Sequence, residues 1–115
     1  MAQDFERYLQ RNISNNSGSP TTLRAAADSD DAIIGIRCSN TSGTSVNVTV
    51  YVENSSTTYH IIKDAPIPSG GSLELIDGGS KVVLQTGDAV KAYASAASSV
   101  DIITSVVHRT LMVFL

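Results

Sequence analysis

The residues able to do acid–base, nucleophilic or metal chemistry are few in this chain and stand far apart. His60 lies inside a predicted strand and His108 at the end of another, and neither has a helical His-x-x-x-His partner or a cysteine at metal-ligand spacing. Cys38, the only cysteine, alternates in phase with Ile34 and Ile36, which indicates a small buried apolar side chain and not a nucleophile. We therefore expect no enzyme activity, no catalytic residue and no cofactor.

One acidic cluster, Asp28, Asp30 and Asp31, has the spacing at which carboxylates can hold a hard cation such as calcium. Its local sequence lacks the glycine and the distal glutamate of an EF-hand loop, so we favour a solvated turn and expect no metal site. The glycine pairs at 70–71 and 78–79 are interpreted as turns, because nothing helical follows them and no Lys-Ser or Lys-Thr pair is adjacent.

The composition narrows the class of partner. The chain has 115 residues, which is the size of one domain, and a net charge of -3. Its eight basic residues are scattered, so we expect no nucleic-acid partner, and no segment approaches the roughly 20 apolar residues of a membrane-spanning helix. A single cysteine cannot form the framework of paired cysteines that is typical of a small secreted domain. This indicates folding in a reducing cytoplasm.

The first 20 residues differ from the rest of the chain. Phe5, Tyr8, Leu9 and Ile13 recur at helical spacing, which predicts a short helix, with an extended arm as the alternative. A helix this short is barely stable alone, so the segment needs something to pack on. Residues 14–20 carry no apolar side chain and are interpreted as a linker.

From residue 21 onward the pattern is that of short strands separated by turns. In the clearest run, 46–52, four valines should face the core while Asn47, Thr49 and Tyr51 face solvent or a neighbouring subunit. The turn at 40–44 predicts a hairpin between this run and the one before it. We expect one all-β domain over residues 21–109, an antiparallel sandwich or jelly roll of about eight strands, with immunoglobulin-like and jelly-roll topology both open. The predicted strands are 21–26, 32–38, 46–52, 58–63, 72–76, 81–85, 89–95 and 100–108.

The last six residues, 110–115, form a strongly apolar tail. Exposed, such a tail is an aggregation liability, so it is expected either to close the home sheet as a ninth strand or to insert into a neighbour. Together with the N-terminal segment it supplies the predicted partner-docking residues. These are Phe5, Tyr8, Leu9, Leu111, Met112, Val113, Phe114 and Leu115.

About two-thirds of the chain carries a resemblance to a known class of protein. It rests on Ile-Gly-Ile-Arg-Cys-Ser-Asn-Thr at 34–41, Val-Thr-Val-Tyr-Val at 48–52, the stretch 59–73, Leu-Gln-Thr-Gly-Asp-Ala-Val at 84–90, and the closing run 100–107. These stretches resemble small β-domain structural proteins of tailed bacteriophage virions. The resemblance implies a copy of a symmetric phage assembly at the tail, neck or capsid surface. The tail from Arg109 onward departs from the pattern.

Together these features predict a non-enzymatic structural component of a bacteriophage virion, associated with the tail or neck and assembled in the host cytoplasm. It would join other virion proteins and copies of itself, as a symmetric homo-oligomer, through its two terminal segments. One alternative is a decoration or cement protein on the capsid exterior. Another, of a different class, is a receptor- or carbohydrate-binding module that would use Tyr51, Tyr59 and Tyr93 as platforms.

Overall fold

The computed structural model describes residues 2–26, 30–76 and 81–110, with side chains from residue 5 to residue 107 within these ranges. The described residues form nine strands and contain no helix, so none that could span a membrane is found among them. The strands are β1 (Ala2–Gln10), β2 (Thr21–Arg24), β3 (Asp30–Asn40), β4 (Val46–Asn54), β5 (Thr57–Ile67), β6 (Ser72–Glu74), β7 (Val82–Leu84), β8 (Ala89–Ala94) and β9 (Val100–Thr110).

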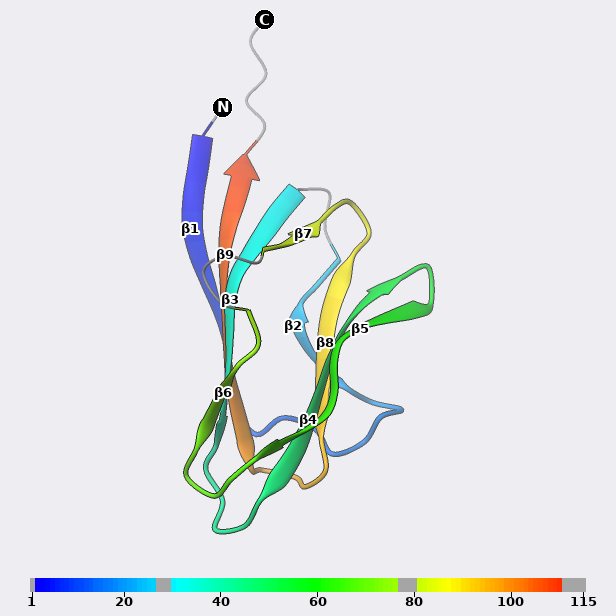
Figure 1. Cartoon of the computed structure of the whole chain (residues 1–115). Coiled ribbons are helices and arrows are strands. Elements are labelled where there is room, and N and C mark those ends of the chain that lie inside the picture. Colours follow the sequence, from blue (N-terminus) through cyan, green and yellow to red (C-terminus); the bar gives the residue numbers. More distant parts are fainter. Residues whose placement is uncertain (1, 27–29, 77–80, 111–115) are drawn as a thin grey trace, which may run out of the picture.

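The strands form two antiparallel sheets packed face to face (Figure 1). Sheet A has the order β1-β9-β3-β6, with β7 also paired to β3, and sheet B has the order β2-β8-β4-β5. If β6 and β7 count as one interrupted strand, successive strands alternate between the sheets except for the β4–β5 hairpin within sheet B, as they do in a jelly roll. The structure therefore decides for jelly-roll topology, which the strand pattern alone left open.

All eight strands predicted from the pattern are present, and the all-β sandwich is confirmed. The helical interpretation of the N-terminal segment is wrong, because Ala2–Gln10 is strand β1, paired along its whole length with β9. Phe5 and Leu9 lie on one face of this strand and Tyr8 on the other. Hydrogen bonding along the whole of β9 stabilises this segment as a strand, whereas a short helix without a packing partner is barely stable.

The predicted hairpin at 40–44 is also wrong, because β3 belongs to sheet A and β4 to sheet B. Asn40, which is 2% exposed, organises this crossing between the layers. Its side-chain oxygen accepts hydrogen bonds from the backbone N–H and the hydroxyl of Ser42, at 2.9 and 2.7 Å. Its amide group donates to the carbonyl oxygens of Thr44 and Ile67, at 2.7 and 2.9 Å. A fully bonded asparagine thus connects the corner to β5 of the second sheet.

The core lies between the sheets and is built from aliphatic side chains. On β4, Val46, Val48 and Val50 are buried as expected and Asn47 is exposed. Thr49 and Tyr51, predicted to face solvent or a neighbour, are instead only 1% and 6% exposed. Strand β5 pairs with β4 with two register shifts, and its Asp64 backbone N–H donates to the Thr49 hydroxyl at 3.0 Å. The ring of Tyr51 packs against His60 of β5 and Tyr93 of β8.

Candidate docking surface

The chemically capable residues do not converge in the described part of the chain. Cys38 is buried, and burial raises the pKa of its thiol to about 12, which suits the predicted packing role. His60 is exposed and its ring contacts Tyr51 at a centroid distance of 5.8 Å. The side chain of His108 lies outside the described residues. No group of three or more His, Cys, Asp or Glu side chains able to hold a metal ion occurs in the described ranges.

The acidic cluster is divided by the fold. Asp30 is exposed, Asp28 lies outside the described residues, and Asp31 is 3% exposed. The expectation of a solvated turn is therefore wrong for Asp31, which forms an ion pair with Arg24 at 3.0 Å. Arg24 is itself buried and also donates to the backbone oxygen of Asp88. Since Arg24 belongs to β2 and Asp31 to β3, the pair joins the two sheets and has a structural role.

The outer face of sheet A is the most apolar exposed surface of the described residues. Along β9, Ile102, Thr104 and Val106 point into the core, so Ile103 and Ser105 point outward. The register of the sheet then places the matching residues of its neighbours on the same side. Among the residues with described side chains, four of the five large apolar side chains that are exposed lie there: Phe5 (79%), Leu9 (56%), Val83 (64%) and Ile103 (44%).

These side chains form two rows that run across the strands. In the first row, Phe5, Val107, Ala32 and Val83 lie opposite one another in consecutive strands. In the second row, Leu9 lies opposite Ile103, which lies opposite Arg37, which in turn lies opposite Glu74. We call this face, defined by both rows and the residues between them, the outer A face.

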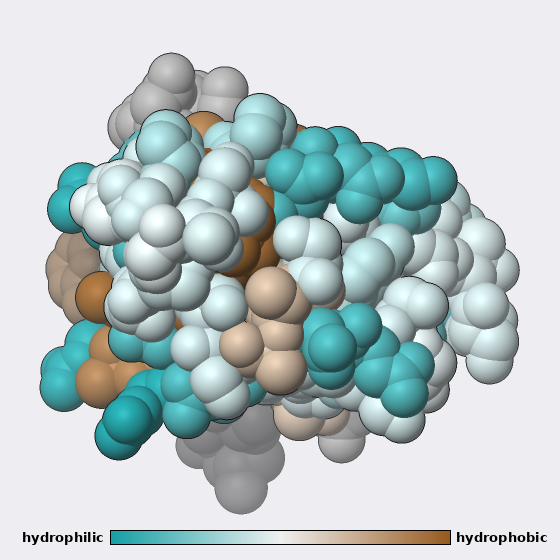
Figure 2. All heavy atoms as spheres, turned by 90° about the horizontal axis from the view of Figure 1, so that it is seen from below, coloured by the Kyte–Doolittle hydropathy of each residue, from teal (hydrophilic) through white to brown (hydrophobic). Residues whose placement is uncertain are grey.

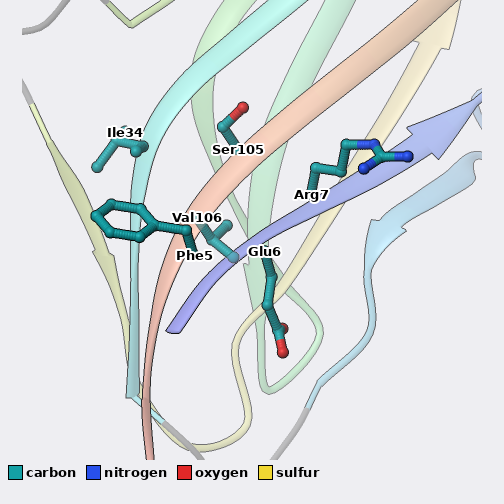
Figure 3. A pocket seen from close by; sticks show the side chains of 6 residues that line it. All are labelled: Phe5, Glu6, Arg7, Ile34, Ser105 and Val106. Carbon is teal, nitrogen blue, oxygen red and sulfur yellow. The ribbon is translucent and has the colours of Figure 1, made fainter. Parts of the chain in front are cut away.

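Between the two rows lies a row of Arg7, Ser105 and Gly35, whose last two members are small. The surface is therefore hollowed there. One hollow of about 330 Å³ is lined by residues that include Phe5 of β1 and Ile34 of β3, from either side of β9 (Figure 3). A second hollow, of about 280 Å³, adjoins it at Ser105 and reaches the exposed Arg37–Glu74 ion pair. The outer A face thus combines exposed apolar side chains with a shallow groove and a charged border.

The outer face of sheet B has a different character. Tyr51 is enclosed by the rings of His60 and Tyr93, with Tyr93 at a centroid distance of 6.4 Å. Beside them, Lys91 donates to the Glu53 carboxylate at 2.7 Å, and this hydrogen bond raises the pKa of Lys91. Because Tyr51 is buried, the three tyrosines suggested as a sugar platform do not form an open stacking surface.

The end of the sandwich formed by the β1–β2, β3–β4, β5–β6 and β8–β9 loops is polar or neutral over most of its surface (Figure 2). Serine, threonine, asparagine and glycine predominate in these loops. Internal hydrogen bonds satisfy many of their polar groups, such as the bond from the Gly18 N–H to the Asn16 side chain at 2.8 Å. This end therefore offers less apolar area to a partner than the outer A face.

The structure separates the predicted docking residues. Phe5 and Leu9 lie on the outer A face, whereas Tyr8 points toward the space between the sheets, where burial raises its pKa. Residues 111–115 lie outside the described residues. Ile103 and Val83 were missed, although a signal existed for Ile103. Both faces of the 100–107 run carry apolar residues, which is unusual for a strand with one solvent face.

The comparisons with known proteins support the fold alone. No family model matches the chain, and no curated protein matches it. Among solved structures, the chain is similar to a subunit of the disulfide-linked pili of Bacillus endospore appendages, with a TM-score of 0.56, 15% identity, and coverage of 96% of this chain and 88% of that one.

It is also similar to the nucleoplasmin-like N-terminal domain of Drosophila FKBP39, with a TM-score of 0.52, 12% identity, and coverage of 97% and 95%. A weaker likeness, with a TM-score of 0.46 and 13% identity, joins 91% of this chain to 32% of a chain from infectious bursal disease virus. The two likenesses with TM-scores above 0.5 show a shared fold and nothing more.

Proposed function

We propose that this protein is a non-enzymatic structural subunit of a bacteriophage virion, associated with the tail or neck, which docks on neighbouring subunits through its outer A face. The observation that carries the proposal is the gathering of Phe5, Leu9, Val83 and Ile103 on that face. Exposed apolar side chains that gather on one face of a protein are typical of interaction sites.

Two further observations support the proposal. The resemblance of the strand and turn pattern to phage structural proteins supplies the class of particle. The likeness to a protein of disulfide-linked pili adds a chain of similar fold that belongs to a pilus. A shallow groove of about 330 Å³ on this face suits a protein surface better than a small molecule, because a ligand pocket encloses most of its ligand.

The proposal is tested by complementation of a gene deletion in the phage, followed by immunoblotting of purified tail and capsid fractions. The double variant Phe5→Lys, Leu9→Lys places two charges on the outer A face and should be depleted from the particles at least tenfold. The matched control is Tyr59→Lys on β5 of sheet B, since Tyr59 has a similar exposed fraction of 59%. This control variant should be incorporated normally.

A second variant tests the groove without adding charge. Gly35 has a negative φ, and a Cβ atom built on it meets no atom within 4 Å, so Gly35→Leu should fold normally while filling the hollow. Reduced incorporation of this folded variant supports docking at the outer A face. Equal incorporation of both outer-face variants and the control would refute it, and finding the wild-type protein outside the tail fraction would refute the tail or neck assignment.

A further inference from the structure

Strand β1 lies at the edge of sheet A and offers its free backbone groups to a further strand. Its nine residues pair with β9 on one side, in a register without any shift, and no described strand pairs with its other side. A regular edge of this length presents a row of N–H and C=O groups spaced to pair with another strand.

The other described edges are unsuited to such pairing. β5 is interrupted by two register shifts against β4, by the left-handed Asp64 (φ 52°) and by Pro66, which has no N–H. At the other edges, β2 has four residues and a register shift, and β6 and β7 have three residues each. Short, bulged or proline-containing strands are the usual means by which proteins block edge pairing. Among the described edges, β1 alone carries none of these features.

We propose that β1 pairs with β1 of a second copy of this chain, antiparallel about a two-fold axis perpendicular to sheet A. β1 is the only long, regular edge that the described part of a second copy can offer, and an edge meets itself antiparallel when the axis is perpendicular to the sheet. Such a contact is isologous, which is the commonest kind in homodimers. The proposal names the first partner of the subunit and so rests on the proposed function.

The side chains of β1 fit this arrangement. The perpendicular axis keeps both outer A faces on the same side, so Phe5 and Leu9 of one copy lie beside the outward side chains of the other copy. These two residues, 79% and 56% exposed in the single chain, then become interior members of one apolar surface.

The pairing is tested with variants of the full-length protein that each carry one added cysteine on β1, oxidised under conditions that form disulfides. The native Cys38 is buried and does not interfere. The two-fold axis places one residue of β1 opposite the same residue of the second copy. The cysteine variant at that position should therefore form a disulfide dimer in high yield, and the variants at the adjacent positions should not. Mixing the variants two residues before and two residues after that position should give a heterodimer. The variants are Phe5→Cys, Glu6→Cys, Arg7→Cys, Tyr8→Cys and Leu9→Cys.

The control is Thr58→Cys, an exposed position on the edge strand β5, which should give no dimer. Sedimentation of the wild-type protein should show a dimer. A monomer at its solubility limit, or a dimer without a disulfide at any of these five positions, would overturn the proposal. The particle assay separates this failure from that of the proposed function. If the protein is monomeric but is still incorporated through its outer A face, only the β1 pairing is refuted.

Discussion

Two buried threonine hydroxyls in the sandwich differ in their hydrogen bonding. Thr104 of β9 is fully buried, and its Oγ1 atom has no hydrogen-bond partner among the described residues. The hydroxyl of Thr49 on β4 accepts a hydrogen bond from the backbone N–H of Asp64 at 3.0 Å. A buried hydroxyl without a partner destabilises the fold, whereas a bonded hydroxyl that holds an irregular strand stabilises it.

We expect Thr104→Val to stabilise the protein by about 1–3 kcal/mol, because valine fills the same space without an unsatisfied hydroxyl. Thr49→Val is the matched control and should destabilise by about 1–3 kcal/mol, since it leaves the Asp64 N–H without its acceptor. Urea unfolding measures both changes through the midpoint at a constant slope. A loss of stability in the Thr104 variant would contradict this account of the core.

The buried thiol predicts how stability depends on alkaline pH. Burial raises the pKa of Cys38 from 9.0 to about 12, so the unfolded chain releases this proton first as pH rises. The unfolded state then binds fewer protons than the folded state, and stability falls by about 1.4 kcal/mol per pH unit within this window. The unfolding free energies of wild type and Cys38→Ala should therefore approach one another between pH 9 and 12. A constant difference would show that the thiol titrates alike in both states.

At the scale of the elements, β4 shows how well the alternation of core-facing and outward-facing residues predicts the effect of a substitution. Val50→Asp places an unpaired carboxylate in the core and should cost several kcal/mol, enough to unfold a small domain. Asn47→Asp changes an exposed side chain and should stay within about 0.5 kcal/mol. Thr49→Asp should also unfold the protein, although alternation alone puts Thr49 on the solvent face. Circular dichroism of the purified variants checks all three outcomes, and a folded Thr49 variant would contradict the burial of this side chain.

The strands after residue 20 could be predicted from the sequence because each needs only a local signal, a short run rich in apolar residues between turn residues. The sheet to which each strand belongs could not, because the turn at 40–44 has the composition of a hairpin and yet crosses between layers through Asn40. The strand state of residues 2–10 likewise depends on β9, at the other end of the chain. For the docking surface, Phe5 and Leu9 were predicted, whereas the contribution of Val83 follows only from its register against Ala32.

At the scale of the whole molecule, the Arg24–Asp31 pair joins the two layers inside the protein. Arg24→Met should destabilise by about 3–5 kcal/mol, because it leaves the Asp31 carboxylate buried without its ion-pair partner. The double variant Arg24→Met, Asp31→Leu removes both charges and should recover most of that loss. Thermal unfolding of the two variants measures the difference. If the double variant is as unstable as the single variant, the ion pair stabilises the fold by more than the mutual neutralisation of its two charges.

The pairing of β1 with β9 also determines when the sheet can form during synthesis. Ala2 lies opposite Thr110 and Gln10 opposite Ile102, so nearly the whole chain separates the partners. At about 5–20 residues per second, the ribosome releases β1 many seconds before β9 exists. β9 is also the strand between β1 and β3, so sheet A lacks its centre until translation is almost finished. Contacts this distant form slowly, so the apolar side chains of β1 stay without their sheet partner in the growing chain until β9 has been made.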